Sequence, residues 1–161
     1  MSSSWCVARG SVRACRPCTS GMPMPVFLPV KRLARHCNPY RGCPWGQRVT
    51  KEMVRRALRE GRCECAPGGM DHAARIAYLV EQEALDAIEV DVGIPALRYF
   101  PRWMLLDGNH RLAAAIYAGR PLIMATVAGS LDYAKRLFGV DCEEPSFSAW
   151  VGNNMDGLSP C

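Results

Sequence analysis

The sequence predicts an α+β fold in which a small mixed β-sheet is packed with helices in a single domain. A length of 161 residues suits one domain built around one core. The composition, 49% hydrophobic and 22% charged, is ordinary for a globular protein and argues against wholesale disorder. Short apolar runs of strand length are mixed along the chain with stretches of helical periodicity, an order typical of this class.

The pattern divides the chain into three parts. Residues 1–24 are rich in Ser, Arg, Cys and Gly without a strand or helix period, so we expect a flexible basic arm. The folded domain is expected over residues 25–140, and residues 141–161 are expected to be a C-terminal tail. No apolar run reaches the ~18 residues of a membrane span, and no signal-peptide pattern is found. We therefore expect a cytoplasmic protein without membrane insertion.

The domain is expected to begin with a strand, a short helix and a loop. Residues 25–30 predict the strand and residues 31–35 the brief helical turn. Residues 37–46 are punctuated by Pro and Gly and predict a loop, which carries Tyr40 and Trp45 between arginines. Aromatic rings in such a loop either stack on bases or plug the core, and the sequence leaves both open.

The next helix is expected over residues 50–60, with Thr50 as its N-cap and Gly61 as its stop. Helical periodicity places its apolar residues on one side and a stripe of cations on the other. Glu52 and Glu60 lie off the stripe, so the cations repel one another, and contact with nucleic acid or phosphate is favoured over a merely solvated face. The stripe consists of Arg48 and the four predicted DNA-binding residues Lys51, Arg55, Arg59 and Arg62.

The charge is divided unevenly between the two parts of the chain. Residues 1–62 hold 13 Lys and Arg against 2 acidic residues, a net charge of +11, whereas residues 63–161 carry −6. The overall net charge of +5 therefore hides a strongly basic half, which favours a polyanionic partner. The nine cysteines are expected to be reduced thiols, because no export signal is found. Structural zinc is the less favoured alternative: Cys15 and Cys18 have a ligand-like spacing, but no second Cys-x-x-Cys or His pair follows at the distance of a zinc finger.

Helices and strands alternate through the rest of the domain. Residues 71–83 predict a helix capped by Asp71, and residues 87–92 predict an alternating strand. Residues 93–102 connect it to a strand over 103–106, and prolines keep this connection out of the sheet interior. After the turn at 107–109, a helix runs from His110 to its stop at Gly119, followed by a buried strand over 121–127 and a last helix from its cap at Ser130 to Phe138.

A strand, a tight turn and a helix meet at residues 105–119, which form a candidate anion site. Gly108 can take positive φ in the turn without a Cβ clash. This geometry aims free backbone N–H groups and the positive helix end at one point, where His110 and Arg111 add a titratable donor and a permanent charge. Phosphate or nucleotide binding is one interpretation. The other is that Asp107 merely caps the helix and Arg111 is a solvated surface residue.

The string DGNHRLAAAIYAG resembles the DG-x-HR-x-AA segment of the ParB/sulfiredoxin superfamily. A weaker likeness to the amino-terminal box of ParB-type domains covers residues 38–40 with Arg48, although residues 41–47 make the spacing longer than in that box. The resemblance spans residues 25–128 and implies a ParB/sulfiredoxin-like fold with nucleotide phosphates at the turn. Asn109 stands where sulfiredoxins carry their reactive cysteine, so sulfinic acid reductase activity is not expected. The positions that match the DG-x-HR-x-AA segment of the superfamily in register are Asp107, Gly108, His110, Arg111, Ala113, Ala114 and Gly119.

The short domain, the basic half and the lack of a helix-turn-helix pair separate the chain from full-length partition proteins. Within the superfamily it resembles most the small plasmid fertility-inhibition proteins, the group of the oncogenic suppression activity. That resemblance implies a cytoplasmic ATPase and DNase that blocks DNA transfer through a type IV secretion system, recruited to the inner membrane face by a partner such as the coupling protein. Two alternatives stay open. One is a non-catalytic inhibitor that binds DNA or a partner and holds nucleotide only structurally, and the other is a small-molecule kinase.

On the hydrolase hypothesis, ATP is the substrate and a divalent cation such as Mg²⁺ neutralises charge on the phosphates. The predicted metal ligands are Asp107 and Asp71, with Glu60 and Glu64 as further oxygen donors. Asp71 and Glu60 have plainer alternatives as a helix cap and a surface residue. The predicted catalytic residues are Asp107, His110 and Arg111, and the predicted nucleotide- or phosphate-binding residues are Gly108, Asn109 and Arg48.

Overall fold

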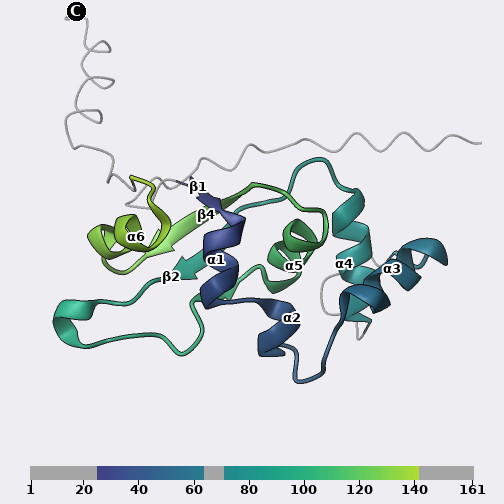
Figure 1. The fold of residues 1–161 in the computed structure, drawn as a ribbon, viewed down its shortest axis with the longest axis horizontal. Coiled ribbons are helices and arrows are strands. Elements are labelled where there is room, and N and C mark those ends of the chain that lie inside the picture. Colours follow the sequence, from purple (N-terminus) through teal and green to yellow (C-terminus); the bar gives the residue numbers. More distant parts are fainter. Residues whose placement is uncertain (1–24, 64–70, 142–161) are drawn as a thin grey trace, which may run out of the picture.

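Four strands and seven short helices make up the part of the chain that the computed structural model describes, residues 25–63 and 71–141 (Figure 1). The predicted arm over 1–24, Glu64 and nearly all of the predicted tail lie outside the described residues. In chain order the elements are β1 (Val26–Pro29), α1 (Val30–His36), α2 (Pro39–Gly42), α3 (Lys51–Arg59), α4 (His72–Glu81), β2 (Ile88–Asp91), η1 (Pro95–Leu97), β3 (Leu105–Asp107), α5 (Asn109–Tyr117), β4 (Leu122–Ala128) and α6 (Leu131–Phe138).

The strands form one mixed sheet in the order β1-β4-β2-β3. β4 runs antiparallel to β1 and parallel to β2, and β3 returns antiparallel along the edge of β2. The parallel pair needs a crossover, which α5 supplies between β3 and β4. The small mixed sheet with packed helices confirms the predicted α+β class.

Alternation along the strands buries one face of the sheet. α1, α5 and α6 contact the strands, and their apolar residues share one core with the sheet (Figure 1). Phe27 and Leu106 point the other way and are exposed. The strand residues buried in this core are Leu28, Ile88, Val90, Leu105, Ile123, Ala125 and Val127.

α5 is the central helix of the molecule. Residues 112–115 form a full turn of buried apolar side chains, so the middle of this helix is buried on every side. Leu112 and Ala115 pack toward the sheet, whereas Ala113 and Ala114 belong to a second core that α3 and α4 complete. The small alanine side chains let these helices approach closely. This packing fixes the amino terminus of α5 relative to both α3 and α4.

The predicted helix caps are confirmed. Thr50 Oγ1 accepts a hydrogen bond from Met53 N at 3.3 Å, and Ser130 Oγ accepts one from Tyr133 N at 3.3 Å. Asp71 Oδ1 accepts one from Ala74 N at 3.0 Å. Each of these bonds satisfies one backbone donor that the first turn of a helix leaves free.

The structure corrects two sequence expectations. The predicted loop over 37–46 contains α2, which Asn38 caps by accepting a hydrogen bond from Tyr40 N at 3.0 Å. The strand expected over 103–106 is β3, and it begins only at residue 105. Trp103 instead packs so closely on α2 that a Cβ on Gly42 would overlap its ring.

No helix within residues 25–63 and 71–141 is both long enough and apolar enough to cross a bilayer.

Candidate functional site

The turn between β3 and α5 has the predicted backbone geometry. Gly108 has φ +97°, and a Cβ there would overlap the side chain of Ile88, so this position requires glycine. The first intrahelical bond runs from Leu112 N to Gly108 O at 2.9 Å. No side chain caps this helix, and no described residue accepts a bond from the N–H groups of residues 109–111. These amides keep the anion-binding capacity that the sequence predicts.

Asp107 and Arg111 bind each other. The Arg111 guanidinium pairs with the Asp107 carboxylate and donates a hydrogen bond to the backbone carbonyl of Ala87. The Arg111 side chain is only 20% exposed. The interpretation of Asp107 as a helix cap is therefore wrong, and so is that of Arg111 as a solvated surface residue. Two of the three predicted catalytic residues, Asp107 and Arg111, thus link α5 to the end of β3 and to the residue before β2.

Asn109 also makes an internal contact. Its Oδ1 accepts a hydrogen bond from Trp103 Nε1 at 3.0 Å. Through this bond the first residue of α5 holds the indole that packs on Gly42. The side chain that was predicted to bind nucleotide thus positions α2 against α5, and a phosphate at this turn would contact the backbone of Asn109.

His110 lies in an aromatic cluster with Trp45 and His72. The Trp45 ring stacks on both imidazoles, with centroids 4.8 Å from His110 and 5.2 Å from His72 at interplanar angles of 23° and 20°. Nδ1 of His72 and Nε2 of His110 lie 3.0 Å apart, so one ring donates a hydrogen bond to the other. Of the two open interpretations of Trp45, the structure favours the plug. The participation of His72 had no signal in the sequence.

Burial lowers the pKa of His110 to about 4, and the charges of His72 and Arg75 act in the same direction against a smaller opposing effect of Asp107. The imidazole is therefore neutral at pH 7. A neutral ring can donate or accept one hydrogen bond, but it brings no positive charge to a phosphate. Any anion at the α5 turn would rely on the backbone amides.

This lowered pKa predicts a loss of stability in mild acid. The unfolded chain binds a proton near pH 6.5, whereas the folded protein resists protonation of His110 until about pH 4. The stabilisation is complete above pH 6.5 and is lost as the pH falls toward 4. We expect the free energy of unfolding, measured by urea denaturation, to fall by roughly 1–2 kcal/mol across this window, after allowance for partial exposure.

Substitution isolates the contribution of His110 from that of the carboxylates. H110F keeps a ring beside Trp45 but cannot titrate, so its stability should fall less over the same pH window. H36A is the matched control, because His36 is an exposed histidine whose ring meets that of Phe138 in an edge-on contact. If H110F and the wild type lost the same free energy of unfolding over this pH window, the assignment of the acid sensitivity to His110 would be wrong.

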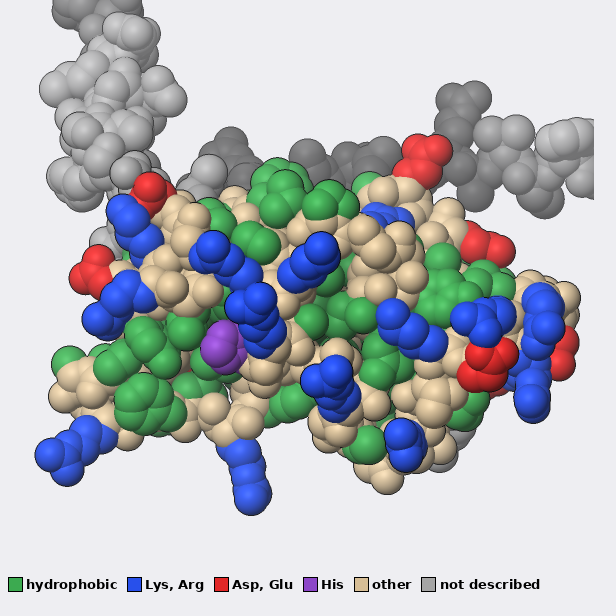
Figure 2. Space-filling view, viewed as in Figure 1, with side chains coloured by type: hydrophobic (Ala, Val, Ile, Leu, Met, Phe, Trp, Pro, Cys, Tyr) green, Lys and Arg blue, Asp and Glu red, His purple; other side chains and the backbone are tan. Residues whose placement is uncertain are grey.

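A basic surface extends from α1 to α3, and we define it by its exposed Lys and Arg side chains. Figure 2 shows Lys and Arg spread across the face on which α1, α2 and α3 lie, with fewer acidic side chains, some of them among the cations at the α3 end. Arg55 pairs with Glu52, and it is the one member that forms an ion pair with a described residue. The basic surface consists of Lys31, Arg32, Arg35, Arg41, Arg48, Lys51, Arg55, Arg56 and Arg59.

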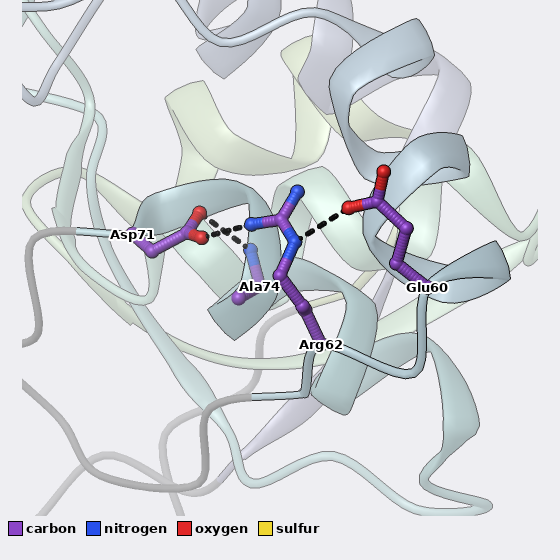
Figure 3. Close-up of polar contacts among 4 residues, drawn as sticks. All are labelled: Glu60, Arg62, Asp71 and Ala74. Atoms are coloured by element: carbon purple, nitrogen blue, oxygen red, sulfur yellow. Dashed lines mark hydrogen bonds and ion pairs between the residues drawn. The ribbon is translucent and has the colours of Figure 1, made fainter.

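Arg62 and Asp71 bind each other, as Figure 3 shows. The Arg62 guanidinium also donates a hydrogen bond to Glu60 Oε2 at 2.7 Å, and Asp71 is the cap of α4. Arg62 therefore ties the end of α3 to the start of α4. The predicted DNA-binding role of Arg62 and the predicted metal-ligand role of Asp71 would each require breaking these bonds, whereas the plainer interpretation of Asp71 as a helix cap is confirmed.

The predicted metal ligands are not gathered at one place. Within the described ranges, no three His, Cys, Asp or Glu side chains come together in a way that could hold a metal ion. The carboxylates of Asp107, Asp71 and Glu60 each pair with an arginine. In the described part of the chain, these three carboxylates therefore lie in separate ion pairs with arginine. Of the cysteines, Cys37, Cys43 and Cys63 are described and form no disulfide.

An open hollow of about 310 Å³ lies between the start of α3 and the start of α4. It adjoins the aromatic cluster, because His72 lines it. It also adjoins the basic surface, because Arg48 lies between the lining residues Gln47 and Val49 in the sequence, and Lys51 lies between Val49 and Met53. Its walls consist of Gln47, Val49, Met53, Asp71, His72 and Ala73.

The chain matches no protein-family model, no curated protein and no solved structure. The likeness to the ParB/sulfiredoxin superfamily therefore stays a prediction that rests on the motif at the α5 turn.

Proposed function

We propose that this protein binds nucleic acid through the basic surface on α1–α3, without hydrolysing it. The observation that carries the proposal is the charge of this surface. All nine of its cations are exposed, and eight of them form no ion pair with a described residue. Phosphate groups spaced along a polyanion are the ligands that match such an array.

The arrangement costs stability in the absence of a partner. Lys51, Arg55 and Arg59 follow one another at intervals of four residues along α3, so each repels the next. Glu52 relieves this repulsion only at Arg55. A surface selected only for solubility would mix the two signs of charge, so the excess of cations supports a phosphate-binding role.

The α5 turn supports binding more than hydrolysis. Asp107 and Arg111 neutralise each other, Asn109 holds Trp103, and Nε2 of His110 lies within hydrogen-bond distance of Nδ1 of His72. None of these side chains is free to activate water or to stabilise a leaving group in this arrangement. This supports the non-catalytic alternative among the functions considered from the sequence.

A salt titration tests the proposal. We expect a fluorescently labelled DNA oligonucleotide to bind at low salt, and the logarithm of the association constant to fall linearly with the logarithm of the salt concentration. Each phosphate contact contributes a slope of about −0.9 on duplex DNA, so four or more contacts should give a slope of roughly −4 or steeper. Fluorescence anisotropy measures both quantities. No binding at low salt, or binding independent of salt, would refute the proposal.

A metal-assisted ATPase and DNase is the second candidate. It is favoured by the backbone N–H groups of residues 109–111, from which no described residue accepts a hydrogen bond. Analysis of the products formed from ATP with Mg²⁺, with and without DNA, separates the hypotheses. Released phosphate or cut DNA would establish a hydrolase, a phosphorylated small molecule a kinase, and unchanged substrates the binding protein. If the protein is a hydrolase or a binding protein, the biological role that we propose is inhibition of DNA transfer through a type IV secretion system.

A further inference from the structure

We propose that the hollow between α3 and α4 receives an unpaired base of a single-stranded nucleic acid, whose phosphates lie against Arg48 and Lys51. This inference rests on the proposed nucleic-acid binding and specifies the form of the partner.

The walls of the hollow have the chemistry that a base requires. Val49, Met53 and Ala73 make them mainly apolar. Gln47 and Asp71 make the rest of the lining polar, and the Asp71 carboxylate is bound to Arg62. Met53 is 45% exposed although it lies in the first turn of a helix beside the second core. Its thioether is polarisable and packs well on aromatic rings. A volume of about 310 Å³ accommodates one planar heterocycle with room for water.

One wall of the hollow is held rigidly in place. The imidazole of His72 is stacked on Trp45, and its Nδ1 lies within hydrogen-bond distance of His110. The helix that begins at His72 is capped by Asp71. A ligand therefore meets an aromatic group that is already ordered, which reduces the entropy that binding would cost.

The surrounding charge selects a strand over a neutral aromatic ligand. Arg48 lies between two lining residues in the sequence, and Lys51 opens the helix that carries Met53. Both cations are exposed and belong to the basic surface. A base in the hollow thus leaves its own phosphates beside positive charge. A duplex keeps its bases stacked inside the helix, so it can satisfy the cations but cannot fill the hollow.

Abasic oligonucleotides test this inference with the full chain. A labelled single-stranded oligonucleotide is compared with one of the same length built from abasic residues, which carries the same phosphate charge. We expect the strand with bases to bind roughly tenfold more tightly, because stacking of even one base contributes in this range. The measurement is fluorescence anisotropy at one fixed salt concentration.

Two variants test whether the preference for the strand with bases depends on the hollow. M53A should reduce the ratio between the two affinities toward one, whereas L97A, which shortens another exposed apolar side chain on η1, should leave it unchanged. Equal binding of both strands by the wild type, with normal salt dependence, would overturn this inference while the proposed function stands. Binding of neither strand would overturn both. A nucleoside monophosphate that competes as well as the whole strand would overturn the assignment to a nucleic-acid chain.

Discussion

The triple variant R48E/K51E/R59E is expected to weaken the binding of a DNA oligonucleotide by at least about 100-fold at low salt. The three side chains are exposed, and none of them forms an ion pair with a described residue. Each substitution removes a phosphate contact and adds a charge that repels the backbone. Arg55 is left unchanged because Glu52 already pairs with it. The slope of the salt titration should become shallower by about 0.9 for each contact that is lost.

A control variant separates local contacts from net charge. R98E/R102E/R136E changes the same number of charges, and all three side chains are exposed in the β2–β3 connection or on α6. In both variants the formal net charge moves from +5 to −1, since three cations become anions. The control should lose much less affinity for DNA than R48E/K51E/R59E. Equal losses would show that net charge alone attracts the DNA.

The substitution G108A is expected to lower the free energy of unfolding by about 3 kcal/mol or more. Two effects add at this position. Gly108 has φ +97°, where a side chain is strained, and a new Cβ would overlap Cγ2 of Ile88 and lie 2.8 Å from its Cβ. Ile88 is fully buried in the core and has no room to move. Urea denaturation at pH 7 measures the change.

G119A is the matched control for this turn. Gly119 also has positive φ, at +68°, but nothing lies within 4 Å of the position that its Cβ would take. It should therefore show the backbone strain alone, about 1 kcal/mol. If both variants lost the same amount, the close contact with Ile88 would not be what requires glycine at the α5 turn.

The parts of the fold that local patterns specify could be predicted from the sequence. Thr50 and Ser130 precede apolar periodic segments and carry the oxygen that a first helical turn needs, so both helix starts were recognised. The glycine bend before α5 was recognised for the same reason. α2 was missed, although Asn38 followed by Pro39 is a regular start for a helix, because the nearby Pro and Gly residues suggested a loop.

Side-chain partners depend on packing between distant elements, and these were not predicted. Arg111 was expected to face a ligand, but the carbonyl of Ala87, 24 positions earlier, lies close enough to accept its hydrogen bond. His72 reaches His110 only because α4 packs against α5, and the two residues are 38 positions apart. No periodicity or spacing within either segment carries that information. The candidate turn could thus be found from the sequence, but the use of its side chains could not.

Contact between α1–α3 and the phosphates of a nucleic acid can be detected residue by residue from the backbone amide NMR shifts during titration with an oligonucleotide. The largest shifts should fall on residues 31–59 and at the start of α4, and added salt should reverse them. Shifts confined to η1 and the exposed face of the sheet, or no shifts at all at low salt, would contradict the proposed contact.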